Sequence, residues 1–178
     1  LRDQIASASG RVTAIIYNNL QNPLGCESSP QEMQAIADIA IEHDLLVLAD
    51  EAYFEMRYSG TSRSIAALDG MAERTVILYT FSKKFAMTGW RLGCAVAPRE
   101  VSAVFGTLNT NNESCTTHFV QWAGVEGIRG DQSGPLAIRR ELQARRDACA
   151  AALNDMAGVS VAVPNATFYL FPDVTDAM

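Results

Sequence analysis

Short apolar runs alternate with an amphipathic stretch over the first half of the chain. Apolar and β-branched residues dominate four runs that predict strands, at positions 11–18, 45–50, 75–80 and 91–97. The 45–50 run is apolar at nearly every position and leads into Asp50-Glu51, which is typical of a strand buried on both faces of a parallel sheet. Between the first two runs, Ser29-Pro30 and Glu32 predict the start of a helix that runs to about His43.

This order of elements predicts an α/β fold with a mostly parallel sheet and helices on both faces. Helical periodicity returns at 99–109, 115–130 and 135–157. Gly158 ends the last helix, and two alternating runs at 159–163 and 167–171 predict strands around Pro164-Asn165. We therefore expect a large domain over residues 1–158 and the first strands of a small α+β domain over residues 159–178.

The charge balance narrows the function to small-molecule chemistry. The 14 Lys and Arg against 20 Asp and Glu give a net charge of −6, which offers no basic surface to nucleic acid or to an anionic membrane. The longest apolar runs are far shorter than the roughly 20 residues that span a bilayer. We expect neither a nucleic-acid partner nor a membrane partner.

The cysteines and histidines lack the spacing of a metal site. No Cys-x-x-Cys pair occurs, and only His43 and His118 could assist a cysteine ligand. The cysteines are Cys26, Cys94, Cys115 and Cys149. We interpret them as reduced thiols of a cytoplasmic protein and expect no metal.

Candidate chemistry gathers at the ends of the predicted strands. The segments are 22–25 (Asn-Pro-Leu-Gly), 50–53 (Asp-Glu-Ala-Tyr), 80–83 (Thr-Phe-Ser-Lys) and 89–93 (Gly-Trp-Arg-Leu-Gly). Ligands of open α/β sheets bind outside the carboxyl ends of the strands, so the four segments can converge on one crevice. Each segment alone is more often a plain turn or a solvated pair, and only their combination indicates a site.

Residues 80–93 (TFSKKFAMTGWRLG) resemble the pyridoxal-phosphate attachment segment of class I and II aminotransferases, which are of the aspartate-aminotransferase type. The Asn-Pro-Leu-Gly loop and the Asp-x-x-Tyr strand end stand upstream in the order that this family has. The resemblance runs from residue 11 to about residue 171. It implies the type I fold, in which residues 1–158 would form the large domain that binds pyridoxal 5'-phosphate (PLP).

The resemblance also implies three catalytic residues. Lys83 stands eight residues before Arg91 and would form the Schiff base with PLP and carry protons, whereas Lys84 is one place out of register. Asp50 would pair with the pyridine nitrogen and keep it protonated, so that the ring acts as an electron sink. Tyr53 would donate a hydrogen bond to the phenolic oxygen of the cofactor.

The remaining cofactor contacts follow from the same resemblance. Asn22 would be a second partner of the phenolic oxygen. Arg91, Ser82 and Thr80 would anchor the phosphate, with Arg91 in bidentate geometry. The predicted cofactor-binding residues are Asn22, Asp50, Tyr53, Thr80, Ser82, Lys83 and Arg91.

The sequence departs from the family pattern at several positions. Leu20 stands where Pro is usual, Leu24 replaces Thr in the Asn-Pro-Thr-Gly loop, and Thr80 replaces a small Ser or Gly. Ala166-Thr167 replaces a Gly-Ala pair near the substrate entrance, which weakens a substrate assignment by analogy. The family's glycine phosphate loop and stacking aromatic would precede residue 11, and its carboxylate-binding arginine would follow Met178. We therefore expect the chain to be the central part of a longer enzyme.

The predicted activity is transfer of an amino group between an amino acid and a 2-oxo acid, in a homodimer. The same cofactor chemistry leaves open a β-lyase acting on sulfur amino acids and a cyclising synthase. A ligand-sensing domain of a transcription regulator is the alternative outside enzymes. A downstream arginine for the substrate carboxylate would favour the enzyme, and an upstream DNA-binding segment would favour the sensor.

Overall fold

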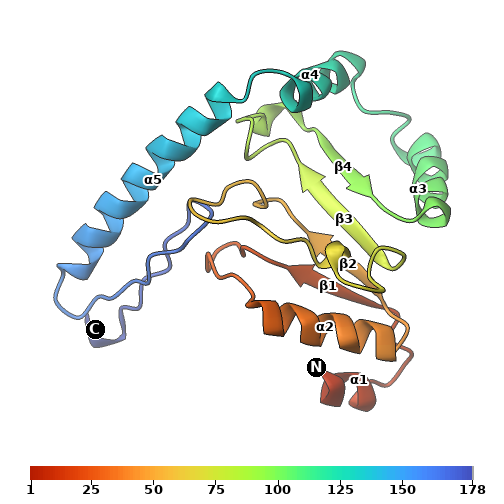
Figure 1. The fold of residues 1–178 in the computed structure, drawn as a ribbon, viewed down its shortest axis with the longest axis horizontal. Helices are drawn as coiled ribbons and strands as arrows, with labels where there is room; N and C mark the ends of the chain where they lie inside the picture. Colours follow the sequence, from red (N-terminus) through yellow and green to blue (C-terminus); the bar gives the residue numbers. More distant parts are fainter. Residues whose placement is uncertain (178) are drawn as a thin grey trace.

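A computed structural model describes residues 1–177 and centres on one four-stranded sheet (Figure 1). The strands are β1 (Ala14–Asn18), β2 (Leu46–Asp50), β3 (Thr75–Thr80) and β4 (Gly93–Val96), in that spatial order. β1, β2 and β3 are parallel, and β4 runs antiparallel to β3. The predicted α/β class and the mostly parallel sheet are therefore confirmed.

Helix α2 (Pro30–Glu42) forms where the sequence places it and covers one face of the sheet. The Ser29 hydroxyl accepts from the Glu32 backbone N–H, and the Glu32 side chain accepts from the Ser29 N–H, which completes the predicted capping box. Below the helix, Tyr17 of β1 stands beside Ala49 of β2 in the register of the strands. The core between them is built from Tyr17, Met33, Ala37, Ala40, Leu45, Val47, Ala49, Ile65 and Met71.

The opposite face of the sheet carries both apolar and chemically active side chains. Successive side chains of a strand point to opposite faces, so Ile16, Leu46 and Leu78 share this face with Asn18 and Asp50. Ile16 is 78% exposed. Asn18 and Asp50 are register partners at the carboxyl end of the sheet, which is where an α/β sheet offers a ligand site.

Three helices follow the sheet: α3 (Arg99–Asn112), α4 (His118–Arg129) and α5 (Ser133–Asn154). The shorter elements are α1 (Arg2–Ser7) and the 3₁₀ turns η1 (Ile65–Ala67), η2 (Thr88–Trp90) and η3 (Thr175–Ala177). Val120 of α4 packs with Phe81, Met87 and Leu92 around the turn that joins β3 to β4. Over the described part of the chain, no helix is both long and apolar enough to cross a bilayer.

The two strands predicted at 159–163 and 167–171 are not formed. This segment makes only isolated bridges, Ser160 to Asp173 and Ala166 to Arg57. Thr167 has a φ of 67°, in the left-handed region, which interrupts an extended run. Residues 165 and 167 form backbone hydrogen bonds with the segment after β2 instead. The Thr167 N–H, for example, donates to the Met56 carbonyl at 2.9 Å. The division into domains at residue 158 stays a prediction.

Candidate functional site

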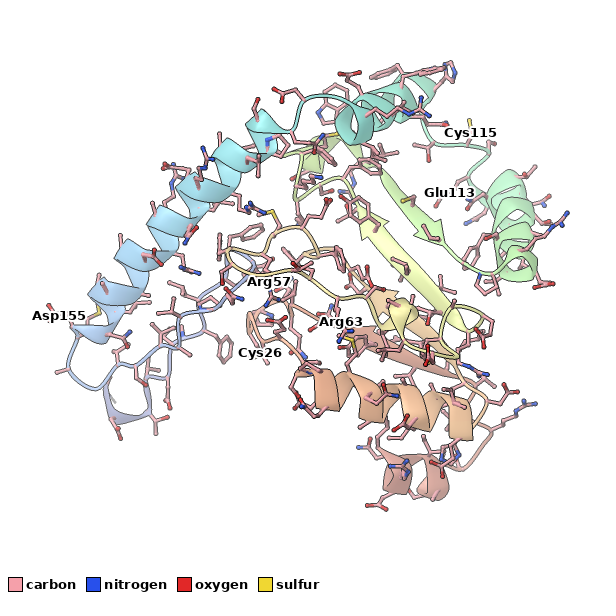
Figure 2. All side chains as sticks on the ribbon, in the orientation of Figure 1. Cys26, Arg57, Arg63, Glu113, Cys115 and Asp155 are labelled. Atoms are coloured by element: carbon pink, nitrogen blue, oxygen red, sulfur yellow. The ribbon has the colours of Figure 1, made fainter. Side chains whose placement is uncertain are left out.

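The loops that follow β1 and β2 meet at the carboxyl end of the sheet. Cys26, on the loop after β1, and Arg57, after β2, lie at this end of the molecule (Figure 2). Arg57 forms an ion pair with Glu27 of the first loop. The two loops that carry the predicted segments 22–25 and 50–53 therefore meet, through residues that follow those segments.

Asp50 is held by two hydrogen bonds at the end of β2. The Asn18 Nδ2 donates to Asp50 Oδ2 at 2.8 Å, and the Ala52 N–H donates to Asp50 Oδ1 at 3.1 Å. The Asn18 Oδ1 is buried and has no hydrogen-bond partner among the described atoms. The sequence motifs did not include Asn18. Its only signal is its position at the end of the strand that precedes the Asn22 loop.

Tyr53 is buried three residues after Asp50, against aromatic residues from the C-terminal segment. Its hydroxyl lies 2.6 Å from the Tyr169 hydroxyl, and its ring meets those of Phe168 and Tyr169 edge to face. Burial raises the pKa of the Tyr53 hydroxyl, and the Tyr169 hydrogen bond and the charge of Asp50 raise this pKa further. Tyr53 therefore stays protonated and can donate a hydrogen bond.

Lys83 lies beside the same aromatic residues. Its Nζ is 5.5 Å from the centroid of the Tyr53 ring and 5.7 Å from that of Phe168, which are cation–π distances. No carboxylate lies within 4 Å of this amine in the described residues. The amine is therefore held in place without an ion-pair partner that a ligand would have to displace.

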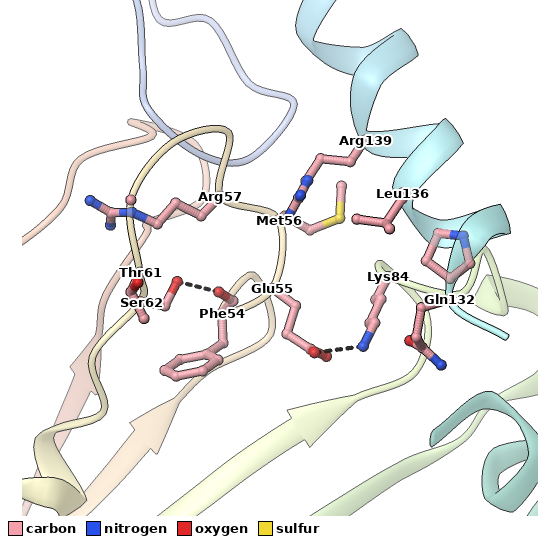
Figure 3. Close-up of a pocket in the computed structure, with 12 residues that line it drawn as sticks. Phe54, Glu55, Met56, Arg57, Thr61, Ser62, Lys84, Gln132, Leu136 and Arg139 are labelled. Atoms are coloured by element: carbon pink, nitrogen blue, oxygen red, sulfur yellow. Dashed lines mark hydrogen bonds and ion pairs between the residues drawn. The ribbon is translucent and has the colours of Figure 1, made fainter. Parts of the chain in front are cut away.

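Lys84 has a different environment. Its Nζ pairs with Glu55 at 2.6 Å, and it lines a cavity of about 360 Å³ between the segment after β2 and α5 (Figure 3). Lys83 does not line this cavity. The cavity drawn in Figure 3 is therefore separate from the predicted cofactor site, and Lys84 is occupied by a structural ion pair.

The predicted phosphate anchors lie around the turn between β3 and β4. The Thr80 hydroxyl accepts from the Ser82 N–H at 3.2 Å and donates to the Leu92 carbonyl at 3.4 Å. Arg91 is exposed, has a left-handed φ of 55°, and donates from Nη1 to the Thr88 carbonyl at 3.0 Å. The turn gathers these three side chains in one region, but no hydrogen bond joins the Arg91 guanidinium to the Ser82 or Thr80 hydroxyl in residues 1–177.

Asn22 is the predicted residue that the structure engages least. It lies exposed on the loop after β1, before a cis peptide bond to Pro23. The loop is closed by a 2.8 Å hydrogen bond from the Gly25 N–H to the Gln21 carbonyl. Over the described chain, the Asn22 side chain makes no hydrogen bond to Asp50 or Tyr53.

Phe168 and Tyr169 are site residues that the sequence motifs did not identify. Both contact Tyr53, and Phe168 also contacts Lys83, from a segment more than 80 residues away in the sequence. The usable signal was their place directly after Ala166-Thr167, the pair that departs from the Gly-Ala of the resembled family pattern.

The chain belongs to the family of class I and II aminotransferases, because the model of that family matches residues 1–178. It is 40% identical over 169 residues to "Aromatic-amino-acid aminotransferase 2" of Thermococcus litoralis, covering 93% of this chain and 43% of that protein. It is 38% identical to an aspartate aminotransferase of Pyrococcus abyssi, with the same coverage.

Solved structures agree with this assignment. The aspartate aminotransferase from Rhizobium meliloti superposes with a TM-score of 0.91 at 27% identity, over 99% of this chain and 45% of that one. An aromatic aminotransferase from Pyrococcus horikoshii gives a TM-score of 0.87 at 35% identity, over 97% and 47%. The predicted type I fold is confirmed. The chain spans less than half the length of these relatives.

Proposed function

We propose that the protein transfers an amino group between an amino acid and a 2-oxo acid, with PLP attached to Lys83. The observation that carries this proposal is the Lys83 amine, free of any carboxylate within 4 Å in the described residues and placed beside a protonated tyrosine. A lysine amine without a carboxylate partner in the described residues can condense with an aldehyde without first breaking an ion pair.

The other residues fit the same cofactor. In the described residues, Asp50 is engaged by an amide and a backbone N–H and by no cation, so the carboxylate could pair with a protonated ring nitrogen. The unpartnered Asn18 Oδ1 beside it is a buried acceptor that a donor on a ligand could satisfy. Arg91 makes no ion pair in the described chain, so its guanidinium can take a phosphate.

The cofactor, when bound, supplies an electron sink for the pair of electrons left when a substrate loses its α-proton. Lys83 has two tasks. Its Nζ would hold the cofactor aldehyde, and as a free amine it could accept and return the α-proton of a substrate. Asp50 would keep the ring nitrogen protonated. Tyr53 and Asn22 would donate hydrogen bonds to the phenolic oxygen, and Arg91, Ser82 and Thr80 would hold the phosphate.

The names of the relatives support amino transfer over the alternatives. The relatives cited above are called aromatic-amino-acid and aspartate aminotransferases, and the family model matches residues 1–178, a range that includes the predicted site residues. A β-lyase, a cyclising synthase and a ligand-sensing regulator would use the same Lys83 and differ in the fate of the substrate. A cytoplasmic location and a homodimer belong to the proposal as well.

Borohydride reduction tests the attachment. The full-length protein is loaded with PLP, reduced and mapped by peptide mass spectrometry, and we expect the adduct on Lys83. A Lys84→Met variant is the matched control and should give the same adduct. An adduct on Lys84 would refute the assignment of the whole 80–93 segment.

A donor screen tests the reaction. Aspartate and aromatic amino acids are offered with a 2-oxo acid, and formation of the new amino acid supports amino transfer. Ammonia release from sulfur amino acids without a new amino acid would indicate the β-lyase. Stable cofactor binding with no turnover of any donor would favour the sensor.

A further inference from the structure

Hydrogen bonds hold residues 164–169 in place, both against the segment after β2 and against α5. The Tyr58 N–H donates to the Asn165 carbonyl at 2.8 Å, and the Thr167 N–H donates to the Met56 carbonyl at 2.9 Å. The Tyr58 hydroxyl donates to the Thr167 carbonyl, and Arg146 of α5 donates to the Pro164 carbonyl at 2.7 Å. Thr167 is fully buried. This docking sets where Phe168 and Tyr169 stand.

Tyr169 is thereby placed on the hydroxyl of Tyr53. The two oxygens are 2.6 Å apart, and the rings cross edge to face at a centroid distance of 5.5 Å. One hydrogen fills the space between the oxygens, so one of the two hydroxyls keeps a hydrogen for another acceptor. Without a ligand, burial raises the pKa of Tyr53 and this bond raises it further, as expected when Tyr53 donates to Tyr169. An acceptor placed beside Tyr53 would take the Tyr53 hydrogen and leave Tyr169 as the donor of the pair.

We propose that Tyr169 is a positioning residue that donates to the Tyr53 oxygen and so directs the Tyr53 hydrogen toward the cofactor's phenolic oxygen. This inference rests on the proposed function. Tyr53 is the member of the pair that follows Asp50, the last residue of β2, and the centroid of its ring lies 5.5 Å from the Lys83 Nζ. Lys83 makes its cation–π contacts with Tyr53 and Phe168 and, in the described residues, none with Tyr169. We therefore expect an acceptor beside Lys83 to meet Tyr53 first. Donation by Tyr169 then strengthens the outward hydrogen bond, because each bond in such a chain polarises the next.

The titratable groups around the Tyr53 hydroxyl determine whether loss of the Tyr169 hydroxyl raises or lowers the pKa of the nitrogen contributed by Lys83. They are Tyr169, Asp50 and Lys83. With PLP bound, a hydrogen bond donated by Tyr53 would withdraw negative charge from the phenolic oxygen of the cofactor. Negative charge on that oxygen favours protonation of the nitrogen that Lys83 contributes, so the Tyr53 hydrogen bond would lower the pKa of this nitrogen. Removing the Tyr169 hydroxyl weakens the donor, so the pKa of that nitrogen should rise.

The test is a pH titration of the absorbance of the PLP-loaded full-length protein. Tyr169→Phe should move the midpoint upward by about half a pH unit, in the direction of Tyr53→Phe and by less. In the Tyr53→Phe background, Tyr169→Phe should cause no further shift, because it acts only through Tyr53. Tyr58→Phe is the matched control. It removes another tyrosine hydroxyl that docks the same segment, and it should leave the midpoint unchanged.

The outcomes separate this proposal from the proposed function. An unchanged midpoint in Tyr169→Phe, or an equal shift with and without Tyr53, would overturn the positioning role while the Lys83 adduct stands. A shift of the same size in Tyr58→Phe would overturn it too, since loosened docking would then be the cause. If the wild-type protein gives no adduct on Lys83, both proposals fall.

Discussion

Gly25, on the loop that carries Asn22, packs against Pro164 of the C-terminal segment. A methyl group at Gly25 should displace both the loop and this segment. Its φ is 66°, in the left-handed region that favours glycine. A Cβ at this position would stand 2.7 Å from Pro164 Cβ and 3.4 Å from its Cγ. Proline is rigid, so the methyl group can be accommodated only by moving backbone. Gly25→Ala is the perturbation.

Gly60 supplies a comparison at nearly the same backbone angle, φ 72°. A Cβ there would meet the Arg57 Nε at 3.3 Å, a contact that a small shift of this side chain relieves without moving backbone. Gly60→Ala should therefore cost only the left-handed conformation, about 1–2 kcal/mol. Gly25→Ala should cost that amount plus about 1–3 kcal/mol for the overlap with Pro164.

Denaturant and thermal unfolding of the two variants measure the difference. One kcal/mol corresponds to roughly 2–4 °C in Tm for a chain of this size, so Gly25→Ala should melt at least about 2 °C below Gly60→Ala. Gly25→Ala should also bind PLP more weakly, because the loop that carries Asn22 must shift. Equal losses of stability in the two variants would refute the contact between the loop and Pro164 as the cause.

Three other perturbations address charge and exposed surface. Asp50→Ala should keep PLP bound and slow α-proton exchange, whereas Arg91→Ala should weaken PLP binding by about 2–5 kcal/mol; equal loss of PLP on titration would contradict this division. Burial raises the pKa of the Glu51 carboxyl, so its charged form opposes folding as pH rises through that raised value. The stability of Glu51→Gln relative to wild type should therefore improve from about pH 4 to about pH 8, and a constant difference would count against it. Ile128 is 63% exposed on α4 beside other exposed apolar residues, so Ile128→Lys should reduce light scattering by the 178-residue chain and change its unfolding free energy by no more than about 0.5 kcal/mol.

Elements specified by contiguous residues were predictable from the sequence. The Ser29 cap and Pro30 define the start of α2 because the capping contacts join residues three positions apart. β3 begins and ends at the predicted Thr75 and Thr80, where an apolar run meets polar residues. The motifs of the candidate site could be recognised in the same way, since each is a short segment at a strand end, and the roles of their residues stay predictions.

Features specified by distant contacts were not predictable in this way. The alternation at 167–171 resembles a strand, yet Thr167 is left-handed and bonds to Met56. The partner of the Tyr53 hydroxyl lies 116 positions along the chain. Periodicity describes which side chains can face a core, and it carries no information about which distant segment supplies the hydrogen-bond partner.

Asn18 lies between these two cases. Parallel pairing of β1 with β2 aligns Asn18 with Asp50, so the amide reaches the carboxylate once the register is known. The register follows from the apolar residues that both strands direct toward α2, because a slip of one residue would turn them to the other face. The packing that stabilises the core thus also places an amide on the carboxylate of the candidate site. A site residue such as Asn18 can therefore be found by aligning the ends of neighbouring strands, whereas a search for residues close in sequence to a known motif would miss it.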